Sequence, residues 1–351
     1  MDMVSIRALM MERQCLSKPA DNKEKYIQLF RLMQPVAPTF FSRPGDPPCL
    51  VHRVDFDDKL HNDILRGKRG IVKARFQGGN IGYVAVEDFE LYIAAFKKPI
   101  EKLNFKQKYI LDVITHTGPL GCKQIKEETG ILNKEITPVL HRLQEAFLVY
   151  EDQVDSEWDR AWYNFENEWY DIDINKYSQK DAIKQILLKF LKCNVFSKLQ
   201  GIKDWFKLPM KDIKEALQEL EAEGEIVEIG VEGTIGWMRK DDFTLLSNSE
   251  FIIKPSVFML HKSDFLVKSN ESMLKQKYKG LEVLQYLLID GEFKGVVLGH
   301  WRIGPYDVED IITELPEQER ECRKVEIINA VAWYYKLPFS NIKKYHGKEM
   351  P

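Results

Sequence analysis

The feature that most constrains the fold is a pattern of secondary structure that the middle of the chain repeats. Residues 103–169 and residues 181–243 each predict helix, helix, turn, longer helix and β-hairpin. The parallel segments are 121–130 and 199–209 for the short helix with its turn, and 133–143 and 211–220 for the longer helix. A repeat of this length indicates one supersecondary unit used more than once. This order of elements is typical of a winged helix, which most often binds double-stranded nucleic acid.

Bulk properties exclude several classes of protein. The 351 residues are enough for two or three cores, and the 44% apolar and 30% charged fractions are ordinary for a soluble protein. No apolar run approaches the roughly 20 residues of a membrane helix, and the first residues lack a secretory pattern. The five cysteines are scattered, and no Walker, dinucleotide-glycine or His-Glu-x-x-His motif is present. We therefore expect a cytoplasmic protein without a metal, a cofactor or a bound nucleotide.

Charge is segregated along the chain although the net charge is only −3. Residues 66–75 carry five cations and no carboxylate, and residues 176–214 hold ten lysines against three aspartates. Between them, residues 151–173 hold nine carboxylates, opposed only by Arg160. Such segregation favours a protein that presents one face to a polyanion. The alternative is that these lysines simply lie on solvated faces of amphipathic helices.

The two ends of the chain predict different textures. The first hundred residues predict helices at 5–14, 23–33, 56–65 and 86–96 and a short hairpin at 71–85, which is compatible with a third, degenerate winged helix. Five prolines between residues 33 and 48 predict an ordered loop there. After residue 247 the pattern predicts strands at 251–257, 282–288 and 296–298 and a final helix at 316–335.

The predicted fold class is α+β, with tandem winged-helix domains followed by a strand-rich, β-barrel-like C-terminal domain. Four domains are expected: a helical or degenerate winged-helix domain at 1–100, winged helices at 101–175 and 176–247, and a strand-rich domain with a C-terminal helix at 248–351.

Several phrases, taken in order, resemble the winged-helix DNA glycosylase family of the AlkZ/YcaQ type. The first ones are Leu50-Val51-His52-Arg53, the acidic pair Asp57-Asp58, the basic run 66–75 and the segment 78–89. Further along come Gly118-Pro119-Leu120, Asp264 and the segment 287–295. The resemblance covers most of the chain and rests on the order and spacing of these phrases. It implies a duplex-DNA-binding protein that hydrolyses the N-glycosidic bond of an alkylated or crosslinked base.

The resemblance also places the catalytic motif of the family. A Gln-x-Gln or Gln-x-Asp motif falls on Gln34-Pro35-Val36, so the second polar position is apolar here. The family's histidine and arginine fall on Gly82 and Gly78. Gln34 is the candidate catalytic residue because an amide can position the attacking water beneath a flipped nucleotide. Losing the second anchor costs about 2–4 kcal/mol of transition-state stabilisation. The alternative is that Gln34 caps the preceding helix.

Other candidate residues concern DNA contacts. The basic run supplies phosphate contacts, and the start of the longer helix in the first repeat would meet base edges. Two adjacent aromatics in the proline-bounded loop are wedge candidates, with core packing as the alternative. The proposed DNA-binding residues are Arg66, Lys68, Arg69, Lys73, Arg75, Asn133, Lys134, Thr137 and Arg142, and the wedge candidates are Phe40 and Phe41.

Two other functions fit the same patterns. One is a non-catalytic DNA-binding protein on the same scaffold, such as a regulator or lesion sensor. The other is a protein-interaction module, for which winged helices are also used. The glutamate-rich longer helix of the second repeat and the acidic stretch 151–173 would repel phosphate, so one repeat is expected to serve packing. The sequence leaves the oligomeric state open.

Overall fold

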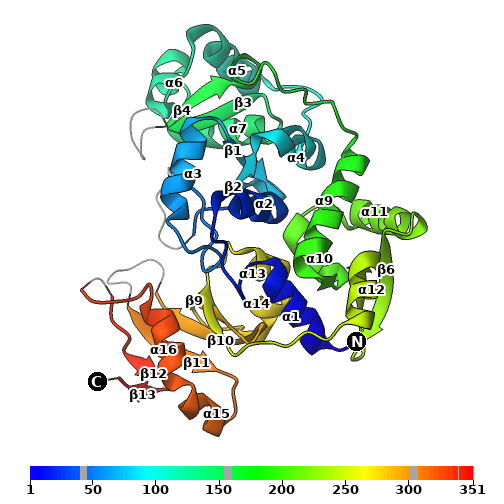
Figure 1. Cartoon of the computed structure of the whole chain (residues 1–351). Helices are drawn as coiled ribbons and strands as arrows, with labels where there is room; N and C mark the ends of the chain where they lie inside the picture. Colours follow the sequence, from blue (N-terminus) through cyan, green and yellow to red (C-terminus); the bar gives the residue numbers. More distant parts are fainter. Residues whose placement is uncertain (40–45, 154–159, 301–306, 339, 351) are drawn as a thin grey trace.

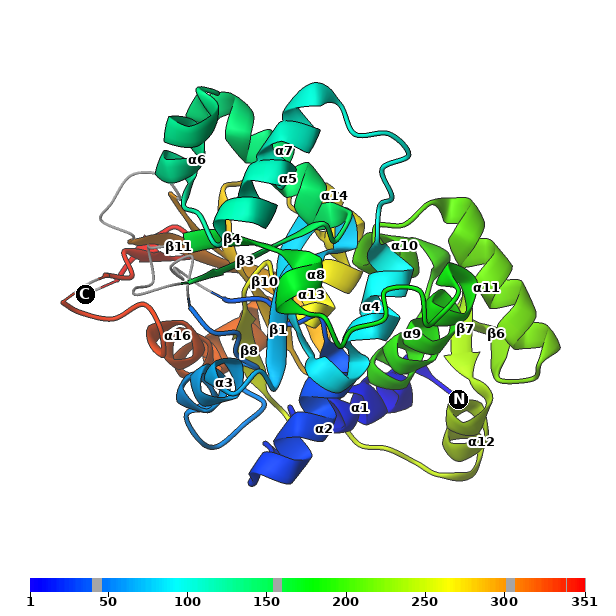
Figure 2. The same cartoon turned by 90° about the horizontal axis from the view of Figure 1, so that it is seen from above.

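The structure is a computed structural model that describes residues 1–39, 46–153, 160–300, 307–338 and 340–350. Figure 1 shows the first repeat at the top, the second repeat on the right and the strand-rich C-terminal part at the lower left, with α2 (Lys23–Met33) and β2 (Asn80–Ala85) between them. Figure 2 shows the same arrangement from above. No helix in these ranges is long and apolar enough to cross a bilayer.

The first hundred residues form helices and one hairpin, as predicted. The remaining elements are α1 (Met3–Arg13), α3 (Asp58–Gly67), β1 (Ile71–Phe76), the 3-10 turns η1 (Gln77–Gly79) and η2 (Val86–Asp88), and α4 (Phe89–Phe96). Helix α2 begins where the Asn22 side chain accepts a hydrogen bond from the Lys25 amide, and α3 begins with the same contact between Asp57 and Leu60. These caps fix where each of the two helices on either side of the proline-rich loop begins.

The first repeat has its own core. It consists of α5 (Phe105–Thr117), α6 (Cys122–Thr129), α7 (Asn133–Glu145), β3 (Val149–Gln153) and β4 (Arg160–Asn164). Helix α6 ends at Gly130, whose φ of 67° is the left-handed conformation that glycine adopts most readily. Buried residues of the three helices pack against Trp162 of β4, and this cluster is separate from the two other apolar clusters of the described chain.

The second repeat follows the short helix α8 (Phe165–Glu168) and has the same element order. It comprises α9 (Gln179–Asn194), β5 (Phe196–Ser197), α10 (Leu199–Phe206), α11 (Met210–Ala222), β6 (Ile226–Val231) and β7 (Thr234–Arg239), followed by α12 (Lys240–Asn248). Lys180 and Lys184 of α9 form ion pairs with Glu219 of α11. The glutamates of α11 therefore serve packing between helices in part.

The three hairpins share one strand order. In the second repeat the order is β5, β7, β6. In the first repeat Leu120 bridges Trp162 of β4, which places it in the position of β5. In the N-terminal part Val36 bridges Tyr83 of β2 in the same way. This common order is an observation that the element pattern alone did not contain.

The C-terminal part is strand-rich, as predicted. Strands β8 (Val257–Leu260), β9 (Val283–Ile289), β10 (Glu292–Gly299), β11 (Val308–Thr313), β12 (Lys344–Tyr345) and β13 (Lys348–Glu349) form one sheet in the order β13-β12-β11-β10-β9-β8. Within the described residues this is an open sheet, so the barrel-like expectation is corrected. Residues 251–256 form no strand, and the predicted final helix is broken into α15 (Glu317–Cys322) and α16 (Lys324–Ala332). Helices α13 (Phe265–Ser269) and α14 (Glu271–Lys277) lie between β8 and β9 in the chain.

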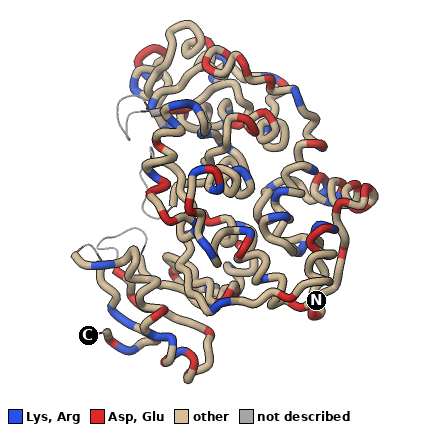
Figure 3. Tube along the Cα trace, viewed as in Figure 1, with Lys and Arg blue, Asp and Glu red and all other residues tan. Residues whose placement is uncertain are grey.

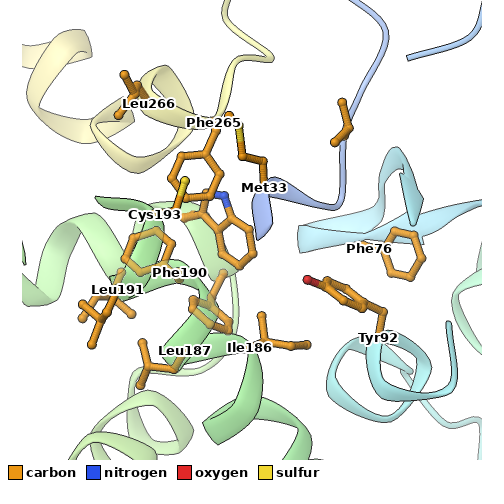
Figure 4. Close-up of a cluster of buried hydrophobic side chains, with 14 of the residues drawn as sticks. Met33, Phe76, Tyr92, Ile186, Leu187, Phe190, Leu191, Cys193, Phe265 and Leu266 are labelled. Atoms are coloured by element: carbon orange, nitrogen blue, oxygen red, sulfur yellow. The ribbon is translucent and has the colours of Figure 1, made fainter. Parts of the chain in front are cut away.

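One large core unites the N-terminal part, the second repeat and the start of the C-terminal part. Figure 4 shows Phe190 of α9 between Phe265 of α13 and the side chains of Ile186 and Leu187. The ring centroids of Phe190 and Phe265 are 5.6 Å apart, a distance at which aromatic pairs attract. Three segments far apart in sequence are thus held together, and the candidate site lies where they meet.

Candidate nucleic-acid interface

A cleft of about 610 Å³ lies where the β1–β2 hairpin, the first repeat, α10 and the α13–α14 segment approach one another. No single repeat could form it, because its walls come from segments more than a hundred residues apart. Its lining includes Ala37, Pro38, Lys73, Gln77, Asn80, Glu151, Arg160, Asp204, Trp205, Lys207, Lys262, Ser263, Lys268, Glu271, Lys275 and Tyr286.

The cleft is positively charged. Six lysine or arginine side chains and three carboxylates line it. Glu271 is bonded by both Lys207 and Lys275. Asp204 accepts hydrogen bonds from the Ser272 amide and hydroxyl at 2.7 and 2.6 Å. The carboxylates are therefore engaged, and the remaining field favours an anion.

Lys268 lies at the floor of the cleft. Its Nζ donates a hydrogen bond to Gln77 Oε1 at 3.2 Å. Burial lowers the pKa of Lys268 to about 8; Asp264 opposes this shift and Lys207 adds to it. A smaller pocket beneath the floor is lined by Pro35 and Val36, and it shares Lys268 with the cleft. The segment that would carry the family's catalytic motif thus borders the lysine.

The side chain of Gln34 lies inside the protein, away from the cleft. It is 0% exposed; its Oε1 accepts a hydrogen bond from the Ala85 amide at 2.8 Å, and its Nε2 donates one to Asp88 at 2.7 Å. Asp88 also pairs with Arg31 and with Lys189 of α9. Val36 pairs with Tyr83 through the backbone, and the Gln34 side chain makes the next contact along β2, with the Ala85 amide. Gln34 therefore has a structural role here. Its side chain does not line the cleft, so in this conformation it cannot contact a water molecule there as expected.

The two glycines at the family's histidine and arginine positions are tightly enclosed or strained. A Cβ on Gly82 would lie 2.7 Å from Pro35 Cβ, well inside van der Waals contact. Gly78 has a φ of 74°, and a Cβ there would lie 3.3 Å from Lys207 Cβ. A larger side chain, such as the family's histidine, therefore has no room at Gly82. At Gly78 any side chain would strain the backbone.

The basic run 66–75 does not form the free phosphate-binding rim that its sequence predicts. Lys73 is 2% exposed and pairs with Glu151 at 3.3 Å, and Arg69 pairs with Glu168 and stacks on Trp169. Arg75 donates hydrogen bonds to Gln144 Oε1 and Gly79 O, each at 2.8 Å. Arg66 pairs with Asp63, while Lys68 is exposed at the end of α3. Two cations of the run thus neutralise the acidic stretch, and this corrects the assignment of Lys73.

The candidate residues on α7 divide into two groups. Asn133, Lys134 and Thr137 are exposed at its N-terminal end. Arg142 instead donates hydrogen bonds to the carbonyls of Lys98 and Pro99, each at 2.8 Å, and holds the segment after α4 in place. The structure therefore does not bring Arg142 to the cleft. Phe40 and Phe41 lie outside the described residues.

The lysines of the α13–α14 segment were missed by the sequence analysis. Lys262, Lys268 and Lys275 lie in a segment between two strands and show no run or spacing that marks a site. Lys207 belongs to the lysine-rich stretch 176–214, in which the sequence pattern did not single out any one residue. Within the described ranges no group of three or more histidine, cysteine or acidic side chains is arranged to hold a metal ion.

The fold is that of a DNA glycosylase of known structure. The superposition has a TM-score of 0.69 and covers 97% of this chain and 100% of the other, at 11% sequence identity. That protein is DNA glycosylase AlkZ from Streptomyces sahachiroi. No protein-family model and no curated protein sequence matches the chain. The expected resemblance is therefore confirmed at the level of the fold.

Proposed function

We propose that this chain binds duplex DNA, with the sugar-phosphate backbone lying over the cationic cleft. In this proposal the two repeats and the Val36–β2–β1 unit are winged helices that surround the duplex. The proposal is supported by their shared strand order, by the exposed start of α7 and by the fold shared with a DNA glycosylase. Non-catalytic binding, by a regulator or lesion sensor, is the form that the site supports best.

The observation that carries the proposal is the charge of the cleft. Lys207, Lys262 and Lys275 are exposed on its walls, and the half-buried Tyr286 adds an aromatic ring. Lysines contact phosphates, and aromatic rings stack on unpaired bases. Because Glu271 is shared between two of the lysines, one carboxylate offsets two cations. A polyanion is the ligand that this arrangement would attract most strongly.

The test is a salt-dependent binding measurement on the full chain with a labelled duplex. We expect the affinity to fall as salt rises, and the triple variant Lys207→Gln/Lys262→Gln/Lys275→Gln to reduce the log–log slope by roughly one per lost phosphate contact. The matched control is Lys18→Gln/Lys23→Gln/Lys348→Gln, which changes net charge equally at exposed lysines outside the cleft and outside both repeats. Equal binding by the two triple variants, or no binding by the wild type, would refute the proposal.

A second candidate function is hydrolysis of the N-glycosidic bond of an alkylated or crosslinked base. It is favoured by the glycosylase fold. The pocket that Pro35 and Val36 line has a volume of about 20 Å³, which is room for a water molecule and not for a base. Water positioning by Gln34 would require its hydrogen bond to the Ala85 amide to open first. The test is release of the damaged base from alkylated duplex. Binding without an abasic product selects the non-catalytic function.

A further inference from the structure

Lys268 is placed unlike the other lysines of the cleft. It projects from α13 into the floor, where the cleft and the smaller pocket meet, and its amine contacts Gln77 of the β1–β2 hairpin. Ala37, Trp205 and Ser263 border both spaces beside it. An extended group that reached the floor between the hairpin and Trp205 would meet this amine.

The chemistry of an amine depends on its protonation. Lys207 and Lys275 are ion-paired with Glu271, and this pairing raises the pKa of Lys275. Lys268 is desolvated, which lowers its pKa to about 8 although Asp264 and Glu271 oppose the shift. Roughly a tenth of its amine is therefore neutral and nucleophilic at pH 7, far more than for a lysine with the ordinary pKa. Lys73 is also desolvated, but it is 2% exposed and held by Glu151.

We propose that Lys268 forms a covalent imine with the open-chain aldehyde of an abasic site in DNA bound at the cleft. The neutral amine attacks C1′ of the sugar, a C–N bond forms as the carbonyl π bond breaks, and a proton moves from nitrogen to oxygen to give the carbinolamine. The carbinolamine hydroxyl then takes up one proton from solvent and leaves as water, and the protonated imine remains. No oxidant or reductant is consumed, and addition of water reverses the step. This activity rests on the proposed DNA binding but needs no base excision by the chain itself.

An abasic site suits this position for a physical reason. A nucleotide without a base has lost its stacking and pairing, so its sugar leaves the helix at low cost. Val36 offers no polar side chain to hold a base, whereas Lys268 supplies a nucleophile at the border of the same pocket. The side chains at this site therefore suit a sugar aldehyde better than a damaged base.

The experiment is borohydride trapping of the full chain with a duplex that contains one abasic site. Borohydride delivers hydride to the imine and converts it to a stable amine, so the adduct survives a denaturing gel. We expect an adduct with wild type, mapped by peptide mass spectrometry to Lys268, and a loss of at least about tenfold in Lys268→Arg, because guanidinium stays protonated. Lys211→Arg, outside the cleft, should form the adduct as wild type does.

Each outcome decides the matter. Binding of the abasic duplex without an adduct overturns the imine and leaves DNA binding intact. An adduct that maps to another residue also overturns the assignment, as does one that persists in Lys268→Arg. Absence of both binding and adduct refutes both proposals. If Lys268→Arg fails to fold, as circular dichroism would show, the mapped position in the wild-type adduct decides alone.

Discussion

Arg53 and Asp264 form a buried ion pair that joins the N-terminal part of the chain to the C-terminal part. Arg53 Nη1 lies 2.7 Å from Asp264 Oδ2, and Nη2 lies 3.1 Å from Oδ1. Asp264 also caps α13 by accepting a hydrogen bond from the Leu266 amide at 2.9 Å. The pair thus fixes the helix that carries Lys268. Both residues belong to phrases on which the family resemblance rests, and the structure explains their joint presence.

Removing Arg53 should be strongly destabilising. The side chain is 1% exposed, so Arg53→Met leaves the Asp264 carboxylate buried without its cation, at a cost of about 3–5 kcal/mol. The control is Lys25→Ala, which breaks a solvent-exposed pair with Asp21 and should lower stability far less. Urea unfolding of both variants measures the free energies. Similar losses in the two variants would contradict a structural role for the buried pair.

Gln34→Ala should lower stability whether or not the chain is an enzyme. The change removes the acceptor of the Ala85 amide and one donor to Asp88, which costs about 2–3 kcal/mol. Gln28→Ala, at an exposed position on the same helix, should change stability by less than about 0.5 kcal/mol. Urea unfolding gives both values. A variant as stable as wild type that no longer releases alkylated bases would instead support the water-positioning role.

Gly82→Ala should be destabilising by about 1–3 kcal/mol because the added Cβ would overlap Pro35. Pro35 cannot move away without breaking the bridge between Val36 and Tyr83 of β2. Gly67→Ala is the control, since no atom lies within 4 Å of its added Cβ. Thermal and urea unfolding report the difference. If Gly82→Ala were neutral, the explanation for the missing histidine would be wrong.

His52 should make folding sensitive to acid. Burial lowers its pKa to about 4, and its Nε2 lies 3.0 Å from the Met259 carbonyl oxygen. The folded state therefore binds fewer protons than the unfolded state between pH 6.5 and 4, so stability is full above 6.5 and falls as the pH drops through this window.

The contribution of His52 should be about 3 kcal/mol at its largest. His52→Gln keeps a donor for Met259 and should make the pH dependence of the unfolding free energy less steep between pH 6.5 and 4, where the buried His261 also contributes. His300→Gln, at an exposed position, should leave the profile unchanged. A profile for His52→Gln that is as steep as that of the wild type would show that other groups cause the acid sensitivity.

Local patterns predicted most elements because they depend on neighbours in sequence. Helix α2 was predicted with its observed bounds, and the hairpin of β1 and β2 was predicted to within two residues at each end. The break at Arg323, between α15 and α16, was not predicted. Arg323 forms an ion pair with Asp290 in the turn between β9 and β10, and such a long-range contact has no local signature.

The segregation of charge is plain along the sequence, but the interpretation of the basic run 66–75 as a free surface was wrong in part. Figure 3 shows cations and carboxylates interspersed over much of the folded trace, although they are segregated in sequence. The fold brings Arg69 to Glu168 and Lys73 to Glu151, so the basic run and the acidic stretch neutralise each other. A run of like charge therefore indicates a surface for a partner only if the fold leaves it unpaired.

By itself the sequence determined the repeated helix–hairpin units, the strand-rich end and the resemblance that the fold bears out, since periodicity and turn chemistry act over a few residues. Only the tertiary structure decided which polar groups face the cleft. Gln34 is turned inward to Ala85 and Asp88, while Lys268 is brought to the hairpin by the pairing of Arg53 with Asp264. The orientation and pairing of a side chain depend on contacts between segments distant in sequence, and no local pattern encodes them.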